Sequence, residues 1–152
     1  MTERAYDIEQ ASLEELDLLA TLFDEYRQFY LQKSDVDGAQ HFIKERLTSS
    51  ESVIFIAKSR EGLGLGFTQL YPMFSSVRLK RVWVLNDLYV AESARKLGVA
   101  NGLMLAAEEW GRSQGAVGLE LATAKDNAAA KSVYEARGWA LDNEFDHYSI
   151  TL

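Results

Sequence analysis

The segment from Val82 to about Ser113 constrains the fold more than any other part of the chain. Val82 to Val90 is apolar and rich in β-branched and aromatic side chains, which predicts a largely buried strand. From Gly98 to about Ser113, apolar side chains recur at helical spacing, which predicts an amphipathic helix. A second apolar stretch at 117–123 predicts another strand. A strand, a helix and a strand in this order form a right-handed parallel βαβ unit.

The loop between this strand and this helix has the composition of an anion site. It contains Arg95 and Lys96 and ends in small residues, Gly98 and Ala100. The first amides of a helix have no acceptor within the helix, and the helix dipole favours negative charge at that end. Gly98 also allows the backbone to approach a phosphate closely. The loop therefore predicts a phosphate site, although a helix start with basic residues placed by chance shows the same pattern.

The other elements extend this unit to one mixed, mostly antiparallel sheet of the α/β (α+β) class, with the parallel pair at its centre and helices on both faces. The capping box Ser12-x-x-Glu15 predicts the start of the first helix. The expected order is β-α-α-β-β-β-α-β-α-β-β within a single domain, residues 1–152. The remaining predicted elements are strands at 5–11, 52–58 and 63–71, helices at 12–30, 37–47 and 128–137, and two strands between 139 and 152.

Composition argues against several classes of function. A net charge of −7 does not suit binding to nucleic-acid backbones, which needs a basic surface. An acidic chain suits cationic small substrates, although acidity also serves solubility alone. No apolar run reaches the roughly 20 residues needed to span a bilayer, and the polar N-terminus has no signal-peptide core. We therefore expect a cytoplasmic protein with no membrane or nucleic-acid partner.

The sequence contains no cysteine, which excludes disulfides, thiolate nucleophiles and cysteine-based metal sites. His41 and His147 are its two histidines, and no HExxH pattern occurs. We interpret His41 as a helix residue and His147 as a residue of a C-terminal strand, so no metal is expected.

Two motifs together carry a family resemblance. Arg95-Lys-Leu-Gly98-Val-Ala100 resembles the R/Q-x-x-G-x-G/A signature of the GCN5-related N-acetyltransferases (GNAT). Asn127 and Tyr134 lie about two helical turns apart and hence on one helix face. The segment from Asn127 to Trp139 is similar to that family's second signature, N-x-x-A-x-x-x-Y-e-x-x-G-F, with Trp139 at the usual Phe. The resemblance covers nearly the whole chain and implies the GNAT fold.

A closer resemblance points to one subgroup. The stretch from Asn86 to Val90 resembles the diamine (spermidine/spermine) acetyltransferases and their protein- and polyamine-acetylating relatives. The helix end at 27–30 and the following Ser34-Asp35 are also similar to that subgroup. Asn86 departs from the pattern, because those enzymes have a glutamate there that handles the amine proton.

The resemblance implies transfer of an acetyl group from acetyl-CoA to a primary amine, either a polyamine or diamine, a small amine or a lysine-type acceptor. Transfer is expected within a ternary complex, because no cysteine exists to form an acyl-enzyme. The family also implies a homodimer. The implied contacts are Arg95, Lys96, Leu97, Gly98, Val99, Ala100 and Asn101 for the phosphates, and Leu88, Tyr89, Val90, Asn127 and Tyr134 for the rest of the cofactor.

The same resemblance implies catalytic roles. The Tyr134 phenol, with an ordinary pKa of about 10, suits protonation of a thiol leaving group, although helical spacing alone also fits a core aromatic. The amine must lose a proton, and Asp87 is the first candidate base because it lies just before the amide of Val90, which is expected to polarise the thioester carbonyl. Glu120, a water chain or a purely structural Asp87 are the alternatives.

Aromatic and acidic residues near the end of the first helix are candidate walls of the acceptor site, because this combination suits a cation. Aromatic residues of the core followed by a solvated acidic loop would show the same pattern. The candidates are Tyr26, Tyr30 and Asp35, together with Asp87. The alternative function is a non-catalytic acyl-CoA-binding sensor or a protein-interaction module on the same fold.

Overall fold

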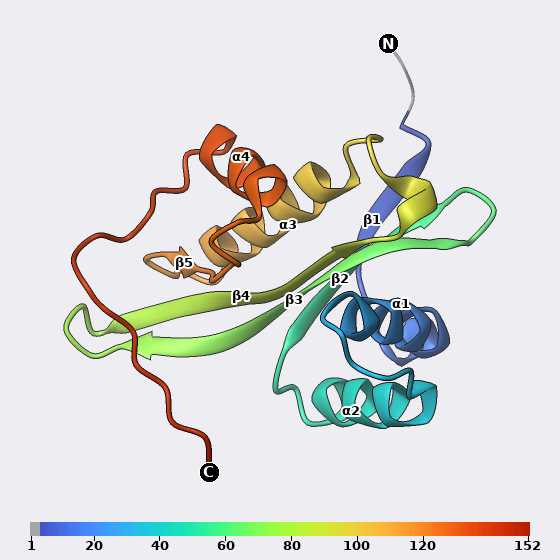
Figure 1. Cartoon of the computed structure of the whole chain (residues 1–152), viewed down its shortest axis with the longest axis horizontal. Coiled ribbons are helices and arrows are strands. Elements are labelled where there is room, and N and C mark those ends of the chain that lie inside the picture. Colours follow the sequence, from blue (N-terminus) through green and yellow to red (C-terminus); the bar gives the residue numbers. More distant parts are fainter. Residues whose placement is uncertain (1–3) are drawn as a thin grey trace. The chain divides into compact units, whose positions relative to one another are not determined.

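A computed structural model describes residues 4–152 (Figure 1). They form two compact units, one up to Ala122 and the other Thr123–Leu152, and each is described by itself. Among the described residues, the first unit contains a five-stranded sheet whose strands lie in sequence order. The strands are β1 (Tyr6–Gln10), β2 (Val53–Ser59), β3 (Gly64–Ser75), β4 (Lys80–Val90) and β5 (Leu119–Glu120).

The predicted strand pairing is confirmed. The first four strands pair antiparallel, and β4 and β5 pair parallel on either side of a crossover helix. The parallel pair lies at the end of the described sheet rather than at its centre. The predicted strand at 117–123 is reduced to Leu119–Glu120, which pair with Trp83 and Val84.

Helices cover both faces of the sheet in the first unit, as predicted (Figure 1). Ile54 and Ile56 of β2 are fully buried beneath the first two helices, whereas Ala57 on the other face packs with Leu103. This alternation follows from the two-residue period of a strand. The helices are α1 (Leu16–Phe29), α2 (Val36–Thr48), α3 (Val99–Ser113) and, in the second unit, α4 (Ala128–Ala136).

The prediction of two strands between Trp139 and Leu152 is wrong for the structure described. This stretch has no regular secondary structure, and its apolar side chains after Trp139 are exposed, with Tyr148 at 94% and Ile150 at 84%. His147 therefore lies in an irregular segment. An apolar alternation forms a stable strand only where a neighbour supplies backbone hydrogen bonds and a covered face.

The β4 strand contains a β-bulge at Asn86. Gln69 of β3 lies opposite Asp87, but the next pair is Leu70 opposite Leu85, so Asn86 has no partner across the ladder. An extra residue in one strand changes the direction in which the following side chains point. The bulge thus sets the orientation of Asp87.

The connection between α1 and α2 is organised by a buried carboxylate. Asp24 is 4% exposed and accepts hydrogen bonds from the Ser34 hydroxyl at 2.7 Å and the Asp35 amide at 2.7 Å. Asp35 in turn caps α2, accepting a bond from the Gly38 amide at 2.9 Å. Helix α2 therefore begins at Val36, slightly before the predicted start.

We expect Asp24→Asn to destabilise the fold by about 1–3 kcal/mol at neutral pH, because an amide cannot accept both bonds as the carboxylate does. Burial raises the pKa of Asp24, but its hydrogen-bond donors and Arg27 outweigh burial and hold the pKa below the ordinary value. The charged form is thus stabilised in the folded state, and the difference between wild type and variant should shrink as pH falls below about 4.

Urea unfolding at several pH values measures this difference. Asp17→Asn is the matched control, because the Asp17 carboxylate accepts one exposed bond from Gln40 at 2.9 Å. A loss at Asp24 no larger than that at Asp17 would contradict the structural role of the buried carboxylate.

Candidate functional site

The loop between β4 and α3 has an unusual backbone. After a short 3-10 turn (Glu92–Ala94), Lys96 and Gly98 both adopt left-handed conformations, with φ of 66° and 80°. This conformation is costly for a residue with a side chain, so the surrounding structure must hold Lys96 in place. The Tyr6 hydroxyl of β1 donates a 2.9 Å hydrogen bond to the Gly98 carbonyl and ties the loop to the sheet.

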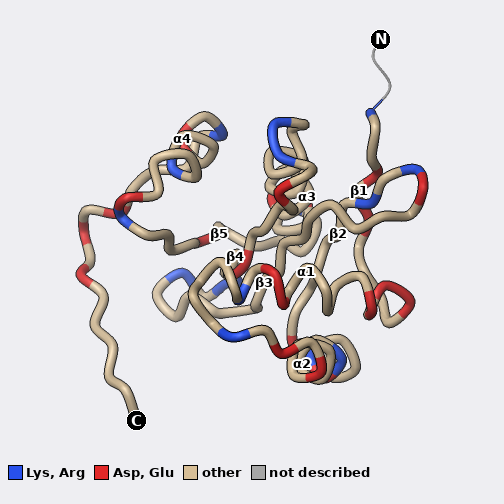
Figure 2. Tube along the Cα trace, turned by 45° about the vertical axis from the view of Figure 1, so that its right-hand side comes forward, with Lys and Arg blue, Asp and Glu red and all other residues tan. Residues whose placement is uncertain are grey.

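The start of α3 offers backbone amides rather than a side-chain cap. Gly98 is the N-cap residue, and the first turn contains no acidic side chain. By contrast, Asp35 and Asn127 cap α2 and α4 with their side chains. Basic residues precede this turn, as the blue segment beside the start of α3 in Figure 2 shows. The predicted phosphate-site residues thus lie in one turn whose amides and charges suit an anion.

The β4 strand is open on one side next to this loop. On its β3 side, β4 is paired as far as Val90, but β5 pairs with β4 only at Trp83 and Val84. Within residues 4–122, no strand pairs with the β5 side of Leu88–Val90. Such an edge can bind the amides of an extended ligand as an added strand does. The loop and the open edge together fit a phosphate-and-amide ligand of the coenzyme A kind.

Asp87 lies in a buried polar cluster on the face of β4 that packs against α1. It is 5% exposed, and its carboxylate accepts hydrogen bonds from the Gln69 amide at 2.7 Å and from the Asn86 amide at 3.1 Å. Gln69 also accepts a 2.8 Å bond from the Ser52 hydroxyl. The Tyr26 hydroxyl is a further hydrogen-bond partner of the carboxylate.

These contacts shift the ionisation of the cluster. Burial raises the pKa of Asp87, and bonds from Gln69, Tyr26 and Asn86 oppose it without cancelling it. Burial and then the charge of Asp87 raise the pKa of Tyr26, and the same two causes raise the pKa of Tyr71 to about 12. The phenols therefore remain neutral donors. Asp87 is the group whose pKa is shifted toward neutral pH.

The structure brings three of the four predicted acceptor residues together and gives the fourth, Asp35, a different contact. Tyr26 and Asp87 are in contact, and the Tyr26 ring also packs 5.1 Å from the exposed Tyr30 ring. Asp35 is instead the N-cap of α2, so the structure gives its carboxylate a structural role. Glu120 pairs with Val84 on the β5 side of β4, whereas the Asp87 carboxylate is held from the β3 side.

An acidic pocket of about 690 Å³ lies between the end of α1 and the end of β4. Neither lysine nor arginine belongs to its lining, which is made by Glu25, Gln28, Tyr89, Ala91, Glu92 and Ser93. Burial, and after it the Glu25 carboxylate, raise the pKa of Tyr89. The sequence analysis did not identify Glu25, Gln28 or Glu92 as candidate site residues. Glu25 and Gln28 share a helix face, but only the tertiary structure brings that face to Glu92.

The second unit contains the other signature residues. Asn127 caps α4, accepting a 3.2 Å bond from the Ala130 amide with its side-chain oxygen. Its side-chain NH₂ is then the donor that it can offer to a ligand. Tyr134 is half-buried, with its ring 6.4 Å from that of Trp139. Trp139 thus keeps an aromatic contact at the position where the signature has Phe.

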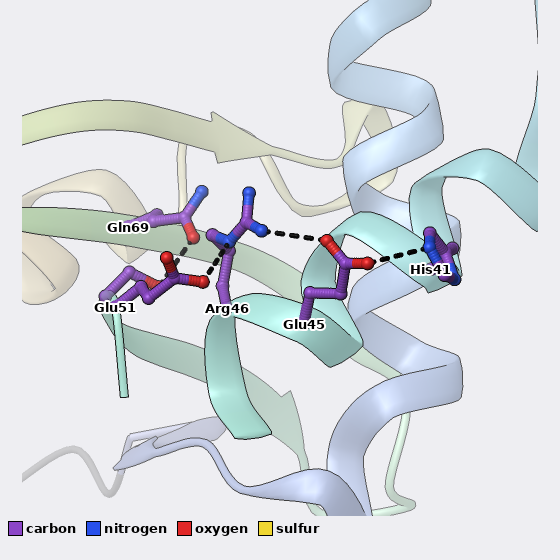
Figure 3. Close-up of polar contacts among 6 residues, drawn as sticks. His41, Glu45, Arg46, Glu51 and Gln69 are labelled. Atoms are coloured by element: carbon purple, nitrogen blue, oxygen red, sulfur yellow. Dashed lines mark hydrogen bonds and ion pairs between the residues drawn. The ribbon is translucent and has the colours of Figure 1, made fainter. Parts of the chain in front are cut away.

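Residues 4–152 contain no cluster of three or more acidic, histidine or cysteine side chains able to hold a metal ion. None of the described helices is both long and apolar enough to cross a membrane. His41 contacts Glu45 at 2.8 Å, and Arg46 links Glu45 to Glu51 in a surface network (Figure 3).

Comparison with known proteins agrees with this geometry. The Acetyltransferase (GNAT) family profile matches residues 16–139. The uncharacterized N-acetyltransferase YhfO of Bacillus subtilis (strain 168) is 44% identical over 146 residues, which cover 96% of this chain and 97% of that protein. An aminoglycoside N(6')-acetyltransferase type 1 of Klebsiella aerogenes is 33% identical over 90 residues, which cover 58% and 59% of the two chains.

Solved structures show the same fold. The crystal structure of a probable acetyltransferase superposes with a TM-score of 0.91 at 47% identity and covers 96% of this chain and 97% of its own. The aminoglycoside N-acetyltransferase AAC(6')-Iy in complex with CoA superposes with a TM-score of 0.81 at 22% identity, covering 99% and 98%. The chain belongs to the GNAT acetyltransferase family and is an N-acetyltransferase that uses acetyl-CoA.

Proposed function

We propose that this N-acetyltransferase acts on a small primary amine that carries at least one further positive charge, as a diamine, polyamine or aminoglycoside does. The observation that supports this acceptor is the pocket lined by Tyr89, two residues along β4 from Asp87. Its lining contains Glu25 and Glu92 and no basic residue. Two carboxylates in one pocket attract and orient a second ammonium group. The aminoglycoside acetyltransferase among the relatives and the resemblance to diamine acetyltransferases fit the same class.

In this proposal both units form one catalytic domain, and the signature residues bind acetyl-CoA, which supplies the acetyl group as a thioester. Amides and basic side chains from Arg95 to Asn101 bind the phosphates. The open backbone edge at Leu88–Val90 and the Asn127 side chain hold the amide-containing arm. The Val90 amide polarises the acetyl carbonyl as an oxyanion donor.

Two side chains move protons. The ammonium of the acceptor gives a proton to the Asp87 carboxylate, which frees the nitrogen lone pair for attack on the acetyl carbonyl. As the C–N bond forms and the C–S bond breaks, Tyr134 donates its hydroxyl proton to the departing sulfur. The second proton that the nitrogen loses on becoming an amide restores the phenol. Because the sequence has no cysteine, attack is direct and no acyl-enzyme forms. A homodimer in the cytoplasm is part of this proposal, and the exposed apolar side chains of residues 141–152 support it as a surface for a second copy.

We expect the double change Glu25→Gln and Glu92→Gln to raise KM for diamines and aminoglycosides by about tenfold, because each lost charge weakens the attraction by about 1 kcal/mol or less near a surface. A monoamine should show little change. CoA release measured over a panel of amines tests this, with the exposed Glu61→Gln as the control. Equal KM values for wild type and variant would contradict the acceptor class, and acetyl-CoA binding without turnover on any amine would indicate a sensor instead of an enzyme.

Tyr134→Phe should lower kcat by about 10²–10⁴-fold, the usual contribution of a general acid, while acetyl-CoA affinity changes little. Steady-state turnover and calorimetric titration with acetyl-CoA separate the two effects. Tyr148→Phe is the control, since the Tyr148 side chain is exposed in the irregular C-terminal segment. Turnover that survives the change at Tyr134 would remove this residue as the acid.

Gly98→Glu should weaken acetyl-CoA binding by at least about tenfold, because it adds a negative charge and a side chain at the start of α3. Gly62→Glu is a matched control, since Gly62 has a similar φ of +86° and nothing within 4 Å of a built Cβ. The control reproduces the backbone strain away from the loop. Equal affinity in the two variants would contradict the phosphate-site assignment.

A further inference from the structure

We propose that Gln69, held by Ser52, is a positioning residue that orients the Asp87 carboxylate and maintains its negative charge for the transfer reaction. This inference rests on the proposed role of Asp87 as the base. Neither Gln69 nor Ser52 belongs to the signature motifs, and both lie on other strands or strand ends than Asp87.

The hydrogen bonds of Gln69 have a fixed direction. A carboxylate can only accept, so the Gln69 NH₂ group must face Asp87, at 2.7 Å, and the Gln69 carbonyl must face Ser52. The Ser52 hydroxyl then has to donate, at 2.8 Å. Gln69 is fully buried and Ser52 nearly so, which means that water cannot replace either bond without opening the sheet.

The bulge in β4 creates this contact. In a regular ladder continued from Leu70 opposite Leu85, Gln69 would lie opposite Asn86. The extra residue brings Asp87 opposite Gln69 instead. Because a shift of one residue moves a side chain to the other face, the bulge is what places the carboxylate over the Gln69 amide.

Gln69 is also the donor that leaves Asp87 able to react. A carboxylate has about four acceptor positions. Gln69 occupies one on Oδ2 and Asn86 one on Oδ1, so that acceptor positions remain for the proton of the acceptor amine. The Gln69 bond is the shorter of the two amide bonds and comes from the fully buried side, so it defines the plane of the carboxylate.

The direction in which loss of the Gln69 donor shifts the pKa of Asp87 can be predicted. The bond favours the charged carboxylate and so opposes the effect of burial on the pKa of Asp87. The other groups that face the cluster are Tyr26 from α1 and Tyr71 from β3, and the charges of Arg46 and Glu51, which form an ion pair (Figure 3), act on Tyr71. Removing the amide leaves these groups in place and raises the pKa of Asp87 further.

The test is Gln69→Met, which keeps the length of the side chain and removes its donor. We expect the rising limb of the pH profile of kcat/KM to move about one pH unit upward, as loss of a hydrogen bond to a charged group predicts. Ser52→Ala should move this limb in the same direction by a smaller amount. In Ser52→Thr, which keeps the hydroxyl, the limb should stay at its wild-type position. The Asp87 carboxyl resonance, followed by ¹³C NMR in the protein without substrates, should titrate with the same shift.

Gln40→Met is the matched control, because it removes a Gln-to-Asp bond of 2.9 Å that is exposed and distant in sequence from the cluster. A Gln69→Met or Ser52→Ala protein with lower activity but an unmoved limb and an unmoved Asp87 resonance would overturn the inference and leave a structural role. The proposed function fails separately: if Asp87→Asn keeps full turnover, Asp87 is not the base, while the resonance still reports whether Gln69 controls the carboxylate.

Discussion

The buried negative charge of Asp87 is the constraint on which the rest of the site depends. A carboxylate that leaves water must be compensated by hydrogen bonds, or it becomes neutral. Here the donors come from three elements: Gln69 from β3, Asn86 from the bulge of β4, and Tyr26 from α1. The sheet register, the bulge and the packing of α1 thus all contribute to the environment that holds the Asp87 carboxylate.

The β4 strand serves different purposes on its face and its two edges. One edge pairs with β3 along almost its whole length, which makes the strand rigid. The other edge is released after two pairs with β5, so backbone groups near Val90 are available to a ligand. The face toward α1 carries Asp87, which belongs to the polar cluster, and Tyr89, which lines the acidic pocket. In the proposed function, cofactor and acceptor therefore approach the same strand end from different directions.

Sequence reasoning succeeded where the signal was local. The strand-loop-helix of 82–113 and the helix at 128–137 were predicted from short-range patterns, because a helix or a buried strand depends mainly on its own residues. The same reasoning was wrong for the two C-terminal strands, since alternation of apolar residues does not show whether a neighbouring strand exists. The assignment of Asp35 to the acceptor wall stays a prediction, and the structure shows this carboxylate as the cap of α2.

By itself the sequence determined the order of elements up to α4, the family and the identity of the motif residues, because these depend on residue type and spacing along the chain. Only the tertiary structure decided which carboxylates meet. Asp87 faces Gln69 because of a one-residue bulge, and Glu25 meets Glu92 because the end of α1 packs beside the end of β4. Such contacts join residues far apart in sequence, and the free energy of packing, rather than any local pattern, selects them.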